Sequence, residues 1–124
     1  MYAETDFLLA LIKDEDWLGE PAERVYRDNR EDLWTSRFTL IELMLVAYRE
    51  ALDAERVVAN AAELVDVRGD VESVLAAATY VEDHDFTPFD ALHLVAADGD
   101  TIVSSDATYD SFAPRYDLRP GDEE

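Results

Sequence analysis

The sequence of 124 residues is long enough to bury a hydrophobic core, and its length is typical of a single domain. It contains no cysteine, which excludes a disulfide framework and a cysteine-ligated zinc site. No apolar stretch is long enough to span a bilayer, and no basic segment precedes the first apolar run. We therefore expect a cytoplasmic protein that has no signal peptide and no membrane contact.

Charge is the unusual feature of the composition, because 30 acidic residues face 10 basic ones and the formal net charge is −20. Such repulsion weakens a compact state in dilute buffer, but in molar salt, where the Debye length is about 3 Å, it is largely screened. We interpret the composition as adaptation to a salt-loaded cytoplasm of the haloarchaeal kind, because the acids are spread along the whole chain. The alternative is a mimic of nucleic acid, in which the acids would gather on one surface.

The first half of the chain predicts helices separated by short extended segments. The apolar run that follows Asp6 predicts a helix for which Asp6 is the N-cap. A later helix over residues 39–52 is apolar over much of its surface, which predicts a central position in the fold. In chain order we expect a strand at 2–5, helices at 7–13 and 21–32, a strand or extended link at 33–36, and helices at 39–52 and 54–64, the last capped by Asp53.

The second half predicts further short strands and two helices. Thr87 and Pro88 predict the start of an apolar helix, with threonine as the N-cap and proline in the first turn, and Gly99 marks its end. In chain order we expect a strand at 65–68, helices at 71–83 and 89–98, a buried strand at 101–105, a short helix or turn at 106–112 and an edge strand at 115–120.

This order of elements predicts an α/β sandwich with a small parallel sheet. The sequence has no internal repeat, no low-complexity segment and no linker that would divide it. We therefore expect one domain over residues 1–119 and a flexible tail over residues 120–124.

The informative acids are those that interrupt apolar elements. Glu42 lies within "TLIELMLVA", and Asp90 lies early in the helix of "FTPFDALHLVAA". Asp106 follows the strand "TIVSS", while Glu4 and Asp6 follow the first strand. Buried carboxylates are costly unless a cation neutralises them, and in open α/β sheets such groups converge beyond the carboxyl ends of the strands. The sequence thus predicts a pocket for Mg²⁺ or Mn²⁺ that activates water against a phosphodiester.

These segments resemble those of PIN-domain nucleases of the VapC toxin class. "ETDFLLAL" is similar to the opening Asp-Thr-Asn/Ser motif of that family, and "TSRFTLIEL" to its Ser...Thr-x-x-Glu-Leu segment, which places an acid at Glu42. "FDALHLVAA" and "IVSSD" resemble the segments that carry the third and fourth acids, here Asp90 and Asp106. The four pieces occur in the order of the family and span nearly the whole chain.

The resemblance implies a three-layer α/β/α fold and an endoribonuclease that depends on Mg²⁺ or Mn²⁺. It implies catalytic, metal-binding roles for Asp6, Glu42, Asp90 and Asp106, with Glu4 as a further metal ligand. A hydroxyl that supports the acids falls on Ser104, and Thr5 is expected to shape the first turn. The resemblance also implies an RNA substrate, a toxin–antitoxin pair with a small antitoxin protein that fills the acidic groove, and a homodimer.

The opening motif departs from the family pattern, because Glu4 takes the position of the leading aspartate and Asp6 that of the asparagine or serine. Either the longer Glu4 side chain reaches the metal, or Asp6 is the ligand and Glu4 supports it. The structural alternative for Asp6 and Asp106 is a helix cap, and for Asp90 a first-turn acid that complements the helix dipole. A damaged site would leave a catalytically impaired, PIN-like protein-binding module.

Four other residues are further candidates for the site, and most of them have a simpler structural explanation. His93 lies three residues after Asp90 and can share its helical face, but a lone histidine there is expected to be structural and not a ligand. Asp110 is a spare acid. Arg37 and Arg49 flank the Glu42 segment and are candidates for phosphate contacts, although each alone is better explained as an ordinary surface arginine.

Overall fold

The computed structural model describes residues 1–69 and 72–119. In this part of the chain the helices are α1 (Thr5–Ile12), α2 (Gly19–Asn29), α3 (Arg37–Arg49), α4 (Ala54–Leu64), α5 (Glu72–His84), α6 (Pro88–Ala97) and the 3-10 helix η1 (Ala107–Ser111). The strands are β1 (Tyr2–Ala3), β2 (Trp34–Ser36), β3 (Asp66–Arg68), β4 (Ile102–Ser104) and β5 (Arg115–Asp117).

The strands form one sheet in the order β3-β2-β1-β4-β5, and every neighbouring pair is parallel. Tyr2 in β1 lies opposite Trp34 in β2 on one side and Ile102 in β4 on the other. The chain builds β2 and β3 on one side of β1 and then returns to build β4 and β5 on the other. The strand order therefore reverses between β1 and β4, which is where open α/β sheets bind their ligands.

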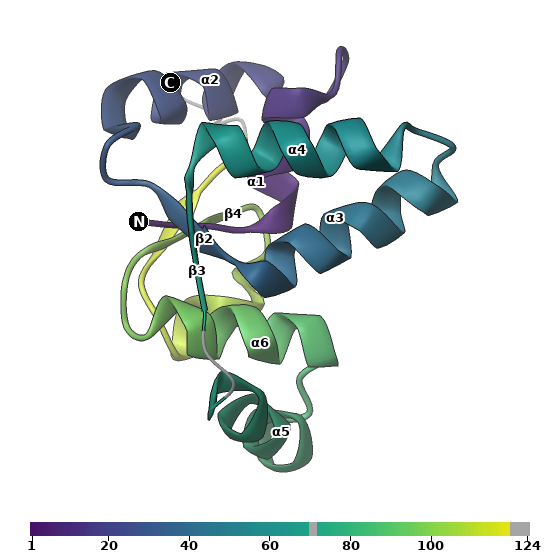
Figure 1. The fold of residues 1–124 in the computed structure, drawn as a ribbon. Helices are drawn as coiled ribbons and strands as arrows, with labels where there is room; N and C mark the ends of the chain where they lie inside the picture. The colour runs from purple at the N-terminus through teal and green to yellow at the C-terminus, as the bar shows by residue number, and fades with distance from the viewer. Residues whose placement is uncertain (70–71, 120–124) are drawn as a thin grey trace.

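Helices cover both faces of the sheet, so the prediction of a three-layer α/β/α sandwich is confirmed (Figure 1). Successive residues of a strand point to opposite faces, and the two central strands show this alternation. Ala3 and Val103 belong to the core beneath α1, α2 and α4, whereas Tyr2 and Ile102 belong to the core beneath α5 and α6. These two apolar layers hold the sheet rigid and fix the ends of its strands.

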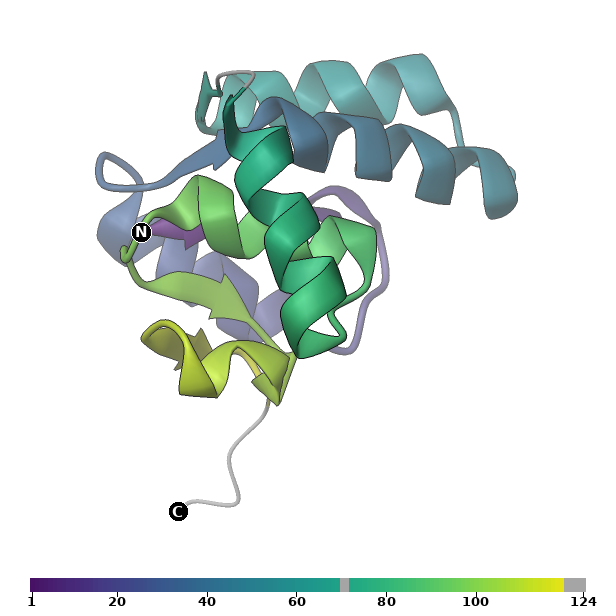
Figure 2. The same cartoon turned by 90° about the horizontal axis from the view of Figure 1, so that it is seen from below.

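Helix α3 is not in the centre of the fold, so the prediction of a central position is wrong. Leu43 and Ala47 are buried, and α3 lies beside α4 (Figure 2). The opposite side of the helix carries a row of apolar side chains that are each at least 44% exposed, which we call the α3 stripe: Ile41, Met44, Leu45 and Tyr48. A helix that is apolar all round can bury only the side that its own fold covers.

The remaining expectations on the fold concern its ends and its surface. β5 lies at the edge of the sheet, as predicted for this segment. The expected tail at 120–124 and the first residue of the helix expected at 71–83 lie outside the described residues. Within residues 1–69 and 72–119, no helix is both long and apolar enough to cross a membrane.

Candidate metal centre

The candidate site lies at the carboxyl edge of the sheet, beside the point where the strand order reverses. β1 ends at Ala3 and β4 ends at Ser104, so the residues that follow each strand leave the sheet next to each other. Helix α3, which follows β2, and helix α6, which precedes β4, bring side chains to the same place. The sheet therefore gathers acids that are up to about a hundred positions apart in the sequence.

Glu4, and not Asp6, caps helix α1, so the predicted capping role of Asp6 is wrong. Glu4 is extended and 7% exposed, and its side-chain Oε1 accepts a hydrogen bond from the backbone N–H of Asp6 at 2.9 Å. The longer glutamate side chain folds back over the first turn, and the helix therefore begins one residue before Asp6. The other oxygen of Glu4 accepts from the hydroxyls of Ser104 at 3.4 Å and Tyr109 at 3.2 Å.

Asp6 faces the start of the loop after β4. Its Oδ2 accepts hydrogen bonds from the backbone N–H and the hydroxyl of Ser105, at 2.8 and 2.6 Å. The Ser104 hydroxyl lies 3.3 Å from the same oxygen, and its single proton serves Asp6 or Glu4 at one time. Its Oδ1 is buried and has no hydrogen-bond partner among the described residues. A buried acceptor without a donor is costly, and a cation is the kind of group that would satisfy it.

Glu42 is held by two groups on its Oε1. The Thr5 hydroxyl donates to this oxygen, and Nε2 of His93 lies 2.6 Å from it. His93 is fully buried in α6, and its Nδ1 lies 2.8 Å from the hydroxyl of Tyr2. No sequence pattern places Tyr2 in a site, because a tyrosine in a short apolar strand is expected to belong to the core.

Asp90 is joined to Glu4 by Tyr109. The buried Tyr109 hydroxyl lies 3.2 Å from a Glu4 oxygen and 3.3 Å from Oδ1 of Asp90, so its single proton serves one carboxylate at a time. Sequence reasoning missed Tyr109 entirely. The only available signal was an aromatic residue in an otherwise small and polar segment directly after Asp106, which is a weak one.

Asp106 caps η1, as the capping interpretation of this residue proposes. Its Oδ1 accepts from the backbone N–H of Thr108 at 2.9 Å, and its own N–H donates to the hydroxyl of Ser104 at 3.0 Å. Ser104 therefore touches Glu4, Asp6 and the backbone of Asp106, which is a supporting position for the acids.

The other polar candidates form no hydrogen bond or ion pair with these acids in the described part of the chain, although the charge of Arg49 helps to lower the pKa of Glu42. Asp110 is exposed and pairs with Arg115 at 2.7 Å, so it is not a spare acid of this cluster. Arg37 donates to the backbone oxygen of Gly69 at 2.9 Å, and Arg49 is exposed.

Crowding of buried carboxylates shifts their protonation equilibria. Burial, with the charge of Asp6, raises the pKa of Glu4 to about 7, and burial also raises the pKa of Asp6. Burial raises the pKa of Asp90 as well, and the charge of Asp106 adds to that rise. Three acids of the cluster therefore hold their protons more tightly than acids in water, which is the expected result of unneutralised charge.

Glu42 and His93 show the opposite behaviour because they form a pair. Burial alone would raise the pKa of Glu42, but the hydrogen bond and charge of His93 outweigh it and hold that pKa below its usual value. Burial alone would lower the pKa of His93, but the Tyr2 oxygen and the carboxylates of Glu42 and Glu4 raise it to about 10. The pair is an ion pair at neutral pH.

The donor set of this cluster fits a hard divalent cation. One ligand atom each from Glu4, Glu42 and His93 lies within 4.8 Å of the others. Nε2 of His93 is engaged with Oε1 of Glu42, so the carboxylates supply the ligands of this group. Asp6, whose charge acts on Glu4, has a buried oxygen without a partner among the described residues. Oxygen-rich sets of this kind suit Mg²⁺ and Mn²⁺ better than softer metals, which prefer thiolates or several imidazoles.

Comparison with known proteins gives a family and two structural relatives. The PIN-domain family matches the chain over residues 1–113. The fold is similar to VapC20 of Mycobacterium tuberculosis, a sarcin-ricin-loop-cleaving toxin, with a TM-score of 0.72 and 18% identity over 89% of this chain and 92% of that one. It is also similar to a chain of a toxin–antitoxin complex from Klebsiella pneumoniae, with a TM-score of 0.71 and 12% identity over 97% and 98%. No curated protein matches the sequence at a significant level.

Proposed function

The chain belongs to the PIN-domain family, and from this premise we propose that it is a divalent-metal-dependent endoribonuclease and the toxin of a toxin–antitoxin pair. Its substrate is RNA, its cofactor is Mg²⁺ or Mn²⁺, and it acts in the cytoplasm. The names of its two structural relatives, a sarcin-ricin-loop-cleaving toxin and a toxin–antitoxin complex, support this assignment.

The observation that carries the proposal is the buried Oδ1 of Asp6, which has no partner within the described part of the chain. It belongs to a cluster in which Glu4, Asp6 and Asp90 have raised pKa values. These raised values show that the basic groups of the protein do not fully offset the burial and mutual repulsion of the carboxylates. Natural proteins tolerate such crowding at functional sites, where a cation or substrate completes the arrangement.

We assign the roles of the acids from their contacts. Asp6, oriented by Ser105, presents its free oxygen, and Glu4 and Glu42 present oxygens that lie close together. Asp90 is tied to Glu4 through Tyr109, and Asp106 completes the acidic set next to Asp90. When bound, the divalent cation supplies Lewis acidity toward the phosphate and makes water a stronger nucleophile.

The deciding experiment combines Mn²⁺ titration with RNA cleavage in molar salt. We expect the wild-type protein to bind Mn²⁺ and to cleave RNA only with metal, and Asp90→Asn to lower cleavage by roughly 10²-fold or more, because charge stabilisation is a large part of such catalysis. Asp28→Asn, an exposed acid of α2, is the matched control and should change neither property. Cleavage that is unchanged in Asp90→Asn would contradict the assignment.

A second candidate function is a catalytically impaired protein-binding module. It is favoured by Glu4, because one of its oxygens already caps α1 and the other accepts from Ser104 and Tyr109. The same titration separates the two functions, since a protein that folds but binds no Mn²⁺ would be such a module.

We also propose two protein partners. A small antitoxin is expected from the toxin assignment and would cover the acidic site. A second copy of the chain is expected on the α3 stripe, because four exposed apolar side chains on one helix face suit a self-complementary dimer contact.

A further inference from the structure

We propose that His93 and Tyr2 form a buried hydrogen-bonded relay that positions the Glu42 carboxylate for metal binding. The inference rests on the proposed metal-dependent function, and it assigns a role to two residues that are neither acids nor metal ligands. His93 and Tyr2 are thus positioning residues, which act on the metal through Glu42.

The first support is the contact between His93 and Glu42. An ionised carboxylate only accepts hydrogen bonds, so at 2.6 Å the Nε2 atom of His93 must carry the proton that it donates to Oε1. The Thr5 hydroxyl donates to the same oxygen. In the residues that the structure describes, Oε2 of Glu42 accepts no hydrogen bond, and it is therefore the oxygen left for a cation.

The second support is the way in which the imidazole is held. The Tyr2 hydroxyl lies 2.8 Å from Nδ1 of His93, 2.7 Å from the hydroxyl of Ser36 and 3.2 Å from that of Thr39. These residues come from β1, α6, β2 and α3, and all four are fully buried. The ring of His93 can neither rotate nor shift without breaking contacts to several elements, so the position of its Nε2–H is fixed by the core.

The third support distinguishes positioning from ligation. His93 is 0% exposed, whereas the side chain of Glu42 is 25% exposed. Nε2 of His93 already faces Oε1 of Glu42 and lies 3.3 Å from the Thr5 hydroxyl. The histidine therefore stands behind the carboxylate, and the carboxylate stands between it and solvent. Partners of ligating side chains in this position commonly set metal affinity by 10- to 100-fold.

Two substitutions of His93 separate its two contacts. In His93→Gln the amide nitrogen can reach the place of Nε2 and keep a donor toward Glu42, whereas in His93→Asn the shorter amide reaches only toward Tyr2. We expect His93→Asn to weaken Mn²⁺ binding by roughly 10- to 100-fold and His93→Gln to restore most of the affinity. Tyr2→Phe removes the shorter hydroxyl contact of Nδ1 and leaves that of Thr39 at 3.3 Å, so it should weaken binding less, by about two- to tenfold. Tyr26→Phe removes a hydroxyl that bonds Leu64 at 3.1 Å and is the matched control.

The readouts are the Mn²⁺ dissociation constant from electron paramagnetic resonance, thermal unfolding of each variant, and the proton NMR spectrum of the metal-free protein. The relay predicts a downfield imidazole N–H resonance in the wild type that is lost in both His93 variants. A folded His93→Asn variant with wild-type Mn²⁺ affinity would overturn the inference and leave the proposed nuclease intact. If both His93 variants fail to fold, an unchanged affinity in Tyr2→Phe overturns it. A wild-type protein that binds no Mn²⁺ overturns the proposed function itself.

Discussion

Glu4 serves two purposes at one position, since it caps α1 with one oxygen and meets Ser104 and Tyr109 with the other. The side chain that caps the first turn of α1 is therefore also a member of the acidic cluster. The consequence is a carboxyl group that is 7% exposed and lies beside the charge of Asp6. Its protonation is therefore coupled to the stability of the fold.

The pH dependence of stability should reveal Glu4 directly. Burial raises the pKa of Glu4 from 4.5 to about 7, so between these values the folded state binds more protons than the unfolded state. The free energy of unfolding therefore falls as pH rises from 5 to 7, by at most about 3 kcal/mol from this group. Glu4→Gln should reduce that decline, measured by chemical denaturation in molar salt with a chelator. Glu82→Gln, an exposed acid of α5, should keep the wild-type decline; equal slopes in both variants would be inconsistent with a buried Glu4.

At the scale of elements, α3 presents one side to the core and an apolar side to solvent. Thr39, Leu43 and Ala47 face the core, whereas the α3 stripe follows the i, i+3, i+4, i+7 spacing of a single helix face and faces outward. Glu42 lies on the same helix and is held by Thr5 and His93. One helix thus carries both a site residue and the surface that we assign to a second copy of the chain.

The dimer is tested by placing a charge on the α3 stripe. Leu45→Glu should weaken self-association by at least tenfold, because the contact would then have to bury a carboxylate without a partner. Sedimentation equilibrium in molar salt measures this. Trp17→Glu alters a side chain that is 66% exposed and lies outside the stripe, so it should leave the association constant unchanged. A wild-type protein that is monomeric at all concentrations would refute the assignment of this surface.

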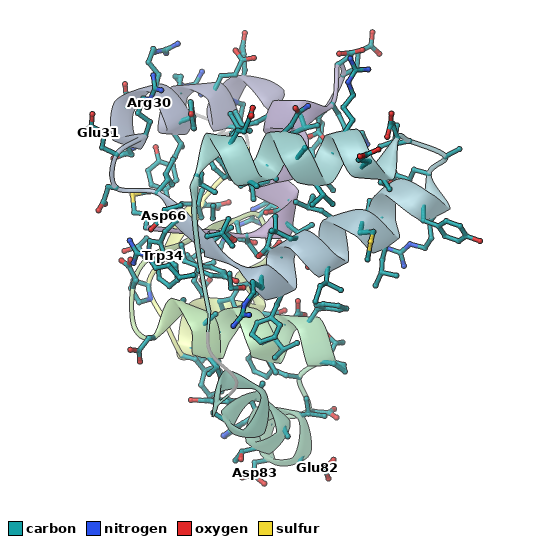
Figure 3. The ribbon with its side chains drawn as sticks, viewed as in Figure 1. Arg30, Glu31, Trp34, Asp66, Glu82 and Asp83 are labelled. Atoms are coloured by element: carbon teal, nitrogen blue, oxygen red, sulfur yellow. The ribbon has the colours of Figure 1, made fainter. Side chains whose placement is uncertain are left out.

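At the scale of the whole molecule, the main feature is the excess of acidic over basic side chains. Figure 3 shows acids at distant parts of the molecule: Glu31 near the end of α2, Asp66 in β3, and Glu82 and Asp83 near the end of α5. This spread agrees with salt adaptation, whereas a nucleic-acid mimic would present them on one face. Because the net charge of the protein is −20, its acids repel one another, and they also repel an RNA substrate.

Stability and activity should therefore both rise with ionic strength. Between 0.1 and 1 M KCl the Debye length falls from about 10 to about 3 Å, so we expect the melting temperature and RNA cleavage with saturating Mn²⁺ to increase together. For cleavage, sucrose at matched osmolarity is the control, since it changes water activity without screening charge. It does not serve for the melting temperature, because its exclusion from the protein surface stabilises the fold by itself. Cleavage that is fastest at low ionic strength would contradict this prediction.

The sequence by itself determined the helix caps and the general order of helices and strands. Asp53 caps α4 by accepting from the N–H of Arg56, and Thr87 with Pro88 begins α6, as predicted from residue types alone. The acids after β1 and β4 were expected to approach each other, because parallel strands bring their carboxyl ends to one edge. These features depend on neighbours in the chain or on a general rule of sheet topology.

Only the tertiary structure decided which side of α3 is covered, that Glu4 and not Asp6 caps α1, and that tyrosines join the acids. Tyr2, Tyr109 and His93 are polar groups in apolar surroundings, and on sequence alone each is a core residue. The Tyr109 hydroxyl meets Glu4 and Asp90, and the His93 imidazole meets Glu42. The Tyr2 hydroxyl meets His93, because the sheet order places β1 between β2 and β4. Contacts of this kind depend on distances across the fold, and a sequence pattern records the types of its residues but not those distances.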